Sequence, residues 1–255
     1  DEQVVLYKRL GRVWADKLGR DRTALDAWRC AFDADPNDMH TLRALAHLYR
    51  ATQSWEELSQ NLRHMLEVAQ VTGTLGEDEM VERYAELGEL EGSILHRIDD
   101  AVTAWQRVLA LEPGDFRALN ALEDLFRNEA RWEECIRVLE QRALALAEDV
   151  QARIATMHEA AAIWEEKVGD DSSAAEVYER VRQLDERNAH ASERLEEIYS
   201  RQARWEELLG VLLERFELAE GAPVRIATLK TMARVYEEQL ADKDNAFACL
   251  HAAFK

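Results

Sequence analysis

The sequence has little proline, glycine or cysteine. Three prolines and ten glycines are spread over 255 residues, and no alternating Val/Ile/Thr-rich run is bounded by turn residues, so a sheet-based fold has little support. The cysteines Cys30, Cys135 and Cys249 lie about a hundred residues apart, which gives neither a disulfide framework nor a CxxC metal knuckle. We therefore expect an all-α protein in a reducing compartment, with the cytoplasm as the default location.

Long apolar runs and a basic surface are also missing. Stretches such as Ala143 to Ala147 are far shorter than the roughly 18 to 20 residues that span a bilayer, so we expect no direct membrane insertion. The chain has 32 Lys and Arg residues and 51 Asp and Glu residues, so its formal charge is −19. This charge disfavours non-specific binding to nucleic-acid phosphates. With 47% hydrophobic residues the chain is too apolar for a disordered acidic tail.

An internal repeat organises the sequence. The segment Trp55-Glu56-Glu57-Leu58 recurs as Trp132-Glu133-Glu134-Cys135 and as Trp205-Glu206-Glu207-Leu208. Other landmarks keep the same spacing, since Pro36 corresponds to Pro113, and Ala24 to Ala101. Each long repeat divides into two helical hairpins, because apolar positions recur at helical spacing on either side of a polar break.

The hairpins resemble a known family. The tetratricopeptide signature alternates large and small apolar residues along two antiparallel helices, and it is matched by Tyr7, Leu10, Gly11, Trp14, Ala24, Trp28, Ala31 and Pro36. This copy has one extra residue in the turn before Ala24. Successive copies start near Val4, Met39, Val81, Phe116, Ile154, Ala189 and Ile226.

The resemblance implies an all-α architecture. We expect an α-solenoid of about seven stacked helix-turn-helix repeats that form a right-handed superhelix, with residues 1–255 as a single solenoid. The stretch Thr72 to Asp78 is the longest break between repeats and the predicted point of bending. Because no polar capping helix follows the seventh copy, and because the first residue is Asp1, we expect the chain to be a fragment of a longer one.

No residue pattern indicates catalysis. His158-Glu159 begins like a zinc-protease helix, but Ala162 stands where the second histidine should be. All seven tryptophans fall on repeat positions, which predicts packing between hairpins, and the Glu pairs after Trp55, Trp132 and Trp205 suit the first turn of a helix. Cys30 and Cys135 fall on positions that pack. We therefore predict a protein that is not an enzyme and has no catalytic, cofactor-binding or metal-binding residues.

In the family, the first helix of each hairpin lines a concave groove. The matching positions of the first two copies are basic and comprise Lys8, Arg12, His40, Arg43, His47 and Arg50. The fourth copy supplies Arg117, Asn120, Asp124, Arg127 and Asn128. We expect an acidic segment of a partner to bind the N-terminal part, and the Asn and Arg side chains of the fourth copy to hydrogen-bond an extended peptide backbone. The alternative is a solvated helix face that only needs to be polar.

Another family site does not fit this chain. Some members hold a terminal carboxylate in a clamp of Lys, Asn and Arg side chains, but only Lys8 matches the clamp, and Ala44 and Glu82 occupy two of its other positions. Recognition of a chaperone tail is therefore disfavoured.

These observations favour a scaffold or adaptor that binds a protein or peptide partner, with no nucleic acid and no cofactor. Two alternatives stay open. One is a regulatory receptor whose curvature shifts when a peptide or small ligand binds, and the other is the recognition arm of a larger protein with a catalytic or signalling domain elsewhere. End-to-end self-association through uncapped ends is a further alternative. The excess of arginine over lysine is a weak indication of a bacterial source.

Overall fold

Fourteen α-helices, two for each of the seven expected repeats, make up the computed structural model, which describes residues 2–254. Within those residues no strand occurs. The all-α prediction is therefore confirmed. The chain divides into two compact units, residues 1–129 and 130–255, called here the N-terminal and C-terminal units.

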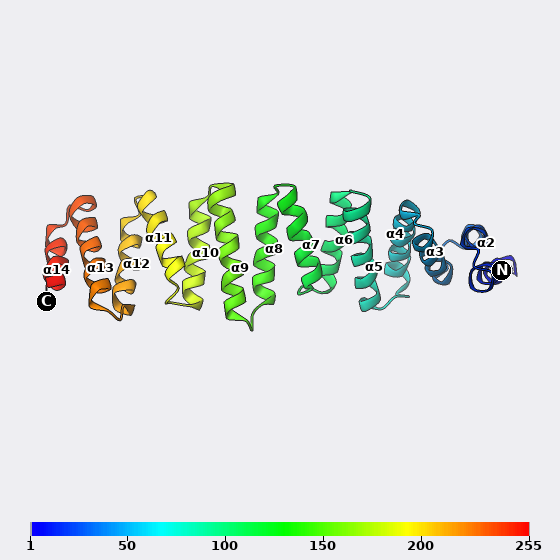
Figure 1. Ribbon diagram of the computed structural model, residues 1–255, viewed down its shortest axis with the longest axis horizontal. Coiled ribbons are helices and arrows are strands. Elements are labelled where there is room, and N and C mark those ends of the chain that lie inside the picture. Colours follow the sequence, from blue (N-terminus) through cyan, green and yellow to red (C-terminus); the bar gives the residue numbers. More distant parts are fainter. Residues whose placement is uncertain (1, 255) are drawn as a thin grey trace. The chain divides into compact units, whose positions relative to one another are not determined.

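The N-terminal unit holds the first seven helices (Figure 1). Each pair of helices packs as a hairpin, and each hairpin packs on the next through its second helix. The helices are α1 (Glu2–Arg12), α2 (Asp21–Ala34), α3 (Met39–Ala51), α4 (Trp55–Thr72), α5 (Glu77–Glu89), α6 (Ile98–Leu111) and α7 (Phe116–Asn128).

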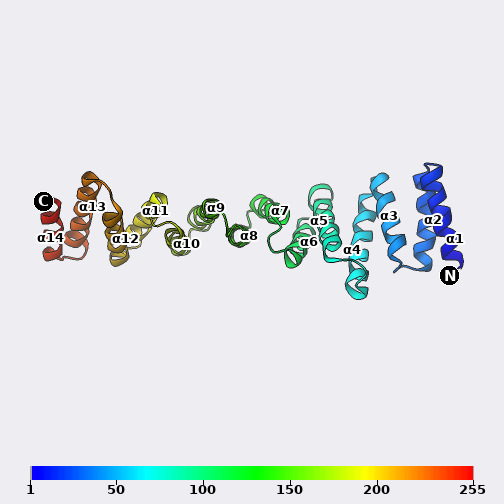
Figure 2. The ribbon, with the colours of Figure 1, turned by 90° about the horizontal axis from the view of Figure 1, so that it is seen from below.

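The C-terminal unit holds the other seven helices, which alternate between two layers. Figure 2 shows α9 and α11 in one layer and α8, α10 and α12 in the other. The helices are α8 (Trp132–Ala145), α9 (Val150–Ile163), α10 (Asp171–Leu184), α11 (Ala189–Arg201), α12 (Trp205–Leu218), α13 (Ala222–Arg234) and α14 (Lys243–Phe254). The handedness of the superhelix and the single-solenoid organisation stay predictions.

The extra residue of the first repeat is accommodated by a π-helical turn. Such turns end the first helix of every odd-numbered repeat, as η1 (Val13–Lys17), η2 (Leu90–Ile94), η3 (Trp164–Val168) and η4 (Val235–Gln239). In η3, for example, Gly169 N–H donates to Trp164 O at 2.8 Å, a bond that spans five residues. A wider turn takes up one more residue without breaking the helix. The four odd-numbered repeats therefore share this feature, which the sequence indicated for the first.

Small residues allow the two helices of a hairpin to approach closely. Gly88 on α5 lies so near Trp105 on α6 that a Cβ atom at Gly88 would be 2.7 Å from the indole Nε1. Trp105 is buried, and so is Trp28, which packs against Gly11 in the same way. The other five tryptophans are half-buried. Both of these close contacts lie within one hairpin. Trp28 also stacks on His40 of the next hairpin, which confirms the predicted packing between hairpins for Trp28; for the other tryptophans it stays a prediction.

The cysteines do not all behave as expected. Cys135 is fully buried, but Cys30 is exposed, so the prediction that Cys30 packs is wrong. Cys30 directly precedes the buried Ala31 on α2, and neighbouring residues on a helix point in different directions. Among residues 2–254, no helix combines the length and the apolar character that crossing a membrane requires.

Candidate interaction surface

The predicted groove residues of the N-terminal unit lie on α1, α3 and α7, which with α5 are the first helices of its hairpins. Their exposed side chains form a surface called here the first-helix face. Lys8 on α1 pairs with Asp38 at the start of α3, with Nζ 2.8 Å from Oδ1. Burial favours the protonated form of Asp38, but hydrogen bonds from Lys8 and Thr41 outweigh it and hold the pKa of Asp38 below its usual value.

His40 adds little positive charge to this face. His40 stacks on Trp28 with ring centroids 5.3 Å apart and an angle of 23° between the planes, and Arg12 hydrogen-bonds its ring. Burial and the nearby charge of Arg12 lower the pKa of His40, which is therefore neutral near pH 7. His47 is exposed on α3.

The arginines of α3 are neutralised by carboxylates of α5. Arg43 donates to Glu79 from Nη2 at 2.8 Å and from Nε at 3.1 Å. Two turns further along, Arg50 donates to both carboxylate oxygens of Glu86 in the same bidentate manner, and Nη2 lies 2.7 Å from Oε2. The first-helix face is therefore a ladder of ion pairs between neighbouring repeats rather than an uncompensated basic patch.

In the fourth repeat, the predicted residues separate into two groups. Arg117 pairs with Glu82 of α5 and with Asp115, each at 3.0 Å, and Arg127 pairs with Glu123 of its own helix at 2.8 Å. The remaining residues, Asn120, Asp124 and Asn128, are exposed on α7.

A hollow of about 560 Å³ lies between the end of α5 with η2 and the helix α7. Its lining includes Gly88, Gly92, Ser93 and Ala121, whose small size leaves space between the helices. The buried side of the lining is apolar and the exposed side is acidic. The apolar side chains are Ile98, Trp105 and Leu125, and the exposed charged and amide side chains are Glu89, Arg117, Asp124, Asn128 and Glu129.

The sequence mapping placed Arg117, Asp124 and Asn128 on the groove, and the structure brings these three to one hollow. The mapping missed the hollow itself, which depends on the small residues and on Trp105. A signal was present, since Gly92 stands where the second repeat has Arg50.

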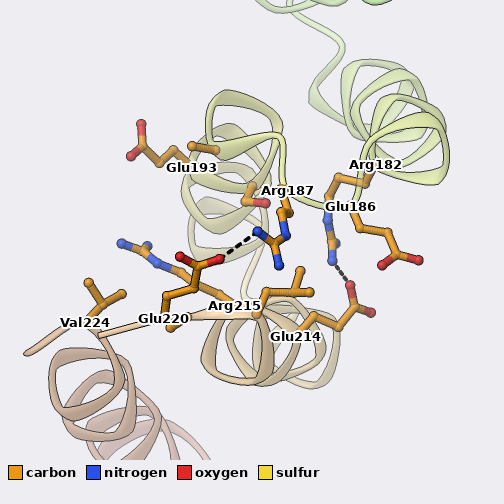
Figure 3. A pocket seen from close by; sticks show the side chains of 12 residues that line it. Arg182, Glu186, Arg187, Glu193, Glu214, Arg215, Glu220 and Val224 are labelled. Atoms are coloured by element: carbon orange, nitrogen blue, oxygen red, sulfur yellow. Dashed lines mark hydrogen bonds and ion pairs between the residues drawn. The ribbon is translucent and has the colours of Figure 1, made fainter. Parts of the chain in front are cut away.

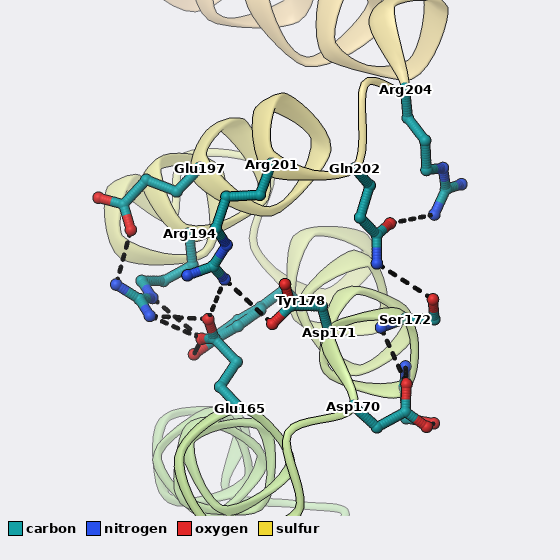
Figure 4. A network of polar contacts seen from close by, with 11 residues as sticks. Glu165, Asp170, Asp171, Ser172, Tyr178, Arg194, Glu197, Arg201, Gln202 and Arg204 are labelled. Carbon is teal, nitrogen blue, oxygen red and sulfur yellow. Dashed lines mark hydrogen bonds and ion pairs between the residues drawn. The ribbon is translucent and has the colours of Figure 1, made fainter.

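The C-terminal unit carries a different polar network, centred on Glu165 of η3 (Figure 4). The Glu165 side chain is 4% exposed. Tyr178 donates to it at 3.2 Å, and Arg194 and Arg201 of α11 each reach it at 2.8 Å. Burial opposes ionisation, but the hydrogen bonds from the two arginines hold the pKa of Glu165 below its usual value. Burial and the charge of Glu165 raise the pKa of Tyr178 to about 12.

A pocket of about 320 Å³ lies where the ends of α10 and α12 meet the starts of α11 and α13 (Figure 3). Arg182 pairs with Glu214, and Arg187 pairs with Glu220 at 2.8 Å. Because each of these arginines faces a glutamate, the pocket offers no uncompensated positive charge to an anion.

Metal ligands do not gather in the part of the chain that the structure describes. His158 and His190 approach each other with ring centroids 4.7 Å apart, but no group of three or more His, Cys, Asp or Glu residues within residues 2–254 is arranged to hold a metal ion. Structural metal sites usually need four ligands.

The comparison with protein families matches two segments of the chain. Residues 118–154 and 191–224 match the family model of the tetratricopeptide repeat. These segments are of tetratricopeptide-repeat type, and each of the seven sequence repeats has the two helices of such a repeat.

Several solved structures are similar to this chain. A crystal structure of MamA is 19% identical, with a TM-score of 0.43, and the match covers 74% of this chain and 95% of the other. YrrB, described as a tetratricopeptide protein with an unusual peptide-binding site, is 14% identical, with a TM-score of 0.42 and coverage of 75% and 91%. A tetratricopeptide repeat protein from Parabacteroides merdae is 12% identical, with a TM-score of 0.42 and full coverage of both chains. No curated protein matches the chain.

Proposed function

We propose that this protein is a non-enzymatic interaction scaffold that binds a partner protein, as an extended segment, on the first-helix face of its N-terminal unit. One observation carries the proposal: hydrogen-bonding side chains of four successive first helices share this face, and a hollow interrupts it between α5 and α7. An extended segment that crosses these helices meets a polar side chain at each of them.

Acidic side chains of the partner bind at the N-terminal end of this face, near Lys8, Arg12, Arg43 and Arg50. The ion pairs of α3 do not prevent this, because a guanidinium has five N–H donors and Arg43 uses two of them on Glu79. Arg43 is also 49% exposed. A partner carboxylate binds the remaining donors or displaces Glu79, and both modes weaken as salt increases.

A second candidate is end-to-end self-association. Phe247 and Phe254 on α14 are 70% and 88% exposed, and Leu6 on α1 is 63% exposed. Exposed apolar side chains of this size favour contact with another apolar surface. Sedimentation velocity over a range of protein concentrations separates this candidate from a monomeric scaffold.

The proposed function is tested by site-specific photocrosslinking in a lysate of the source cells. A photoreactive amino acid replaces Asn120 on the first-helix face or, as a control, the exposed Asp33 on α2. We expect a defined adduct from position 120 that is absent from position 33. Equal adducts at both positions contradict the proposal.

The charge contribution is tested with a matched pair of variants. Arg12, Arg43 and Arg50 are changed together to Gln, and Lys17, Arg22 and Arg107, which are also exposed, are changed to Gln as the control. We expect the first triple variant to lose the position-120 adduct and the control to keep it. An adduct that is unaffected by the first triple variant would show that these three arginines do not contribute to binding the partner.

A further inference from the structure

We propose that the hollow between α5 with η2 and α7 binds a basic side chain, lysine or arginine, of the partner segment. The inference rests on the proposed function and adds the chemistry of one anchor. It differs from the expectation that the Asn and Arg side chains of the fourth repeat hold a peptide backbone.

The hollow is open because its lining residues are small, while its floor is closed by packing. A Cβ atom at Gly92 would lie 3.3 Å from Ala101 Cβ and 3.7 Å from Leu125 Cδ2, so no deeper channel continues below it. Gly88 keeps Trp105 pressed against α5. A side chain that enters from solvent therefore ends against an aromatic and aliphatic floor.

The exposed side of the lining carries uncompensated negative charge. Glu89, Asp124 and Glu129 are exposed there, and none of them forms a side-chain ion pair with another residue of the described chain. Arg117 is the cation of the lining, and it is already held by Glu82 and Asp115. Glutamates elsewhere on the face differ, since Glu79 and Glu86 are each bound by an arginine of α3.

A basic side chain fits both parts of this lining. The methylene groups of lysine or arginine pack on apolar surface while their charged ends stay near the solvent, where Glu89 and Asp124 lie. A bare metal ion would not use the apolar floor, and residues 2–254 contain no group of three ligands to hold one.

The proposed anchor predicts the order of charged side chains along the partner segment. Arginines and Lys8 on α1 and α3 favour acidic side chains, whereas the hollow at α5 and α7 favours a basic one. Both surfaces belong to the N-terminal unit. A segment with acidic residues toward one end and a lysine or arginine toward the other is complementary to this face.

The test titrates the full chain with a Gly/Ser octapeptide that contains a single arginine, and follows the indole N–H signal of Trp105 by NMR. The signal is assigned with the Trp105→Phe variant. Companion peptides replace the arginine with citrulline, which has the same shape without the charge, or with glutamate. We expect the arginine peptide to shift the signal saturably. The citrulline peptide should bind about five-fold more weakly, which corresponds to a difference of about 1 kcal/mol in binding free energy.

Two sets of variants complete the test. The double variant Glu89→Gln/Asp124→Asn should bind the arginine peptide about five-fold more weakly. The control variant Asp33→Asn/Glu112→Gln neutralises exposed carboxylates outside the hollow. It should leave the Kd of the arginine peptide unchanged. Circular dichroism establishes that each variant is folded.

Three results overturn the inference: equal binding of the arginine and citrulline peptides, an unchanged Kd in the Glu89/Asp124 variant, or no shift of Trp105 at about 10 mM peptide. The two proposals can fail separately. Capture at position 120 without any charge preference in the hollow removes this inference alone, whereas a charge-selective hollow without capture at position 120 removes the proposed function.

Discussion

Arg50 on α3 and Glu86 on α5, separated by 36 residues in the sequence, form a bidentate ion pair in which Arg50 Nη2 lies 2.7 Å from Glu86 Oε2. Arg43 and Glu79 repeat this arrangement two turns away at the same sequence separation. The pairs join neighbouring repeats across the first-helix face. The surface that the sequence presents as basic is therefore a set of linked opposite charges.

The Arg50–Glu86 pair should contribute modestly to stability. Both side chains are partly exposed, and pairs of this kind are worth up to about 1 kcal/mol. A double-mutant cycle with Arg50→Ala and Glu86→Ala, measured by urea unfolding, should give a coupling energy of about 0.5 to 1 kcal/mol that falls at high salt. A coupling of zero at low salt would show that the pair is not formed in solution.

The side chain of Glu91 should contribute far more to the stability of the fold than that of its neighbour Glu89. Glu91 is fully buried and stands where other repeats have Trp14 and Trp164; Ser59 hydrogen-bonds it, and Arg63 Nη2 lies 2.8 Å from Oε1. Removing the Glu91 side chain leaves the buried Ser59 hydroxyl without its acceptor, and it empties a fully buried site. Glu91→Ala should therefore destabilise the fold by about 2 kcal/mol.

The control for that prediction is Glu89→Ala, because Glu89 is exposed and such surface changes stay within about 0.5 kcal/mol. The free energies come from urea unfolding with both variants measured side by side. Similar values for the two variants would mean that Glu91 is solvated in solution.

Adding a methyl group to a helix glycine should have opposite effects at two positions. Gly88→Ala places a Cβ atom 2.7 Å from the Trp105 indole, and overpacking of this kind costs about 1 to 3 kcal/mol. Gly210→Ala on α12 meets no atom within 4 Å and should stabilise the fold by up to about 1 kcal/mol, because alanine is the better helix former. Thermal melts of the two variants check the signs, and a stabilising Gly88→Ala would contradict the close approach of α5 and α6.

Because of the Glu165 network, the stability of the C-terminal unit should decrease at acidic pH. The pKa of Glu165 lies below its usual value near 4.5, so the folded chain binds this proton less tightly than the unfolded chain. The stabilisation is therefore fully present above the unfolded pKa and is lost as the pH falls through the folded one. Urea unfolding between about pH 6 and pH 3 should show a weaker pH dependence for Glu165→Gln than for the wild type.

Glu166 provides the control for the pH measurement, since it is the exposed neighbour of Glu165. Glu166→Gln should keep the pH dependence of the wild type. If both variants show the same profile, then Arg194 and Arg201 do not stabilise the charged form of Glu165.

The cysteines should differ in reactivity. Cys30 is exposed and Cys135 is fully buried, so a thiol reagent should modify Cys30 in the native protein at the rate of a small thiol. Cys135 should react only after urea unfolding. The Cys30→Ser variant identifies the signal, and rapid modification of Cys135 in native protein would show that α8 is not packed as described.

The helices and their pairing were accessible to sequence reasoning because they depend on local information. Large and small apolar residues recur at helical spacing within each repeat, and seven copies in phase leave no other way to bury both faces of each hairpin. The extra residue before Ala24 indicated an irregular turn in the first repeat. The positions of the first helices then placed residues such as Lys8, Arg43 and Asn120 on one face.

The charge of that face depended on the tertiary structure. A position on a helix predicts the direction of a side chain but not its partner, so the sequence alone could not show that Glu79 and Glu86 reach back to Arg43 and Arg50. The hollow at Trp105 also forms only when α5 and α7 are packed together. The periodic pattern therefore determined where the helices are, whereas contacts between residues about 36 positions apart decided which charges are left for a partner.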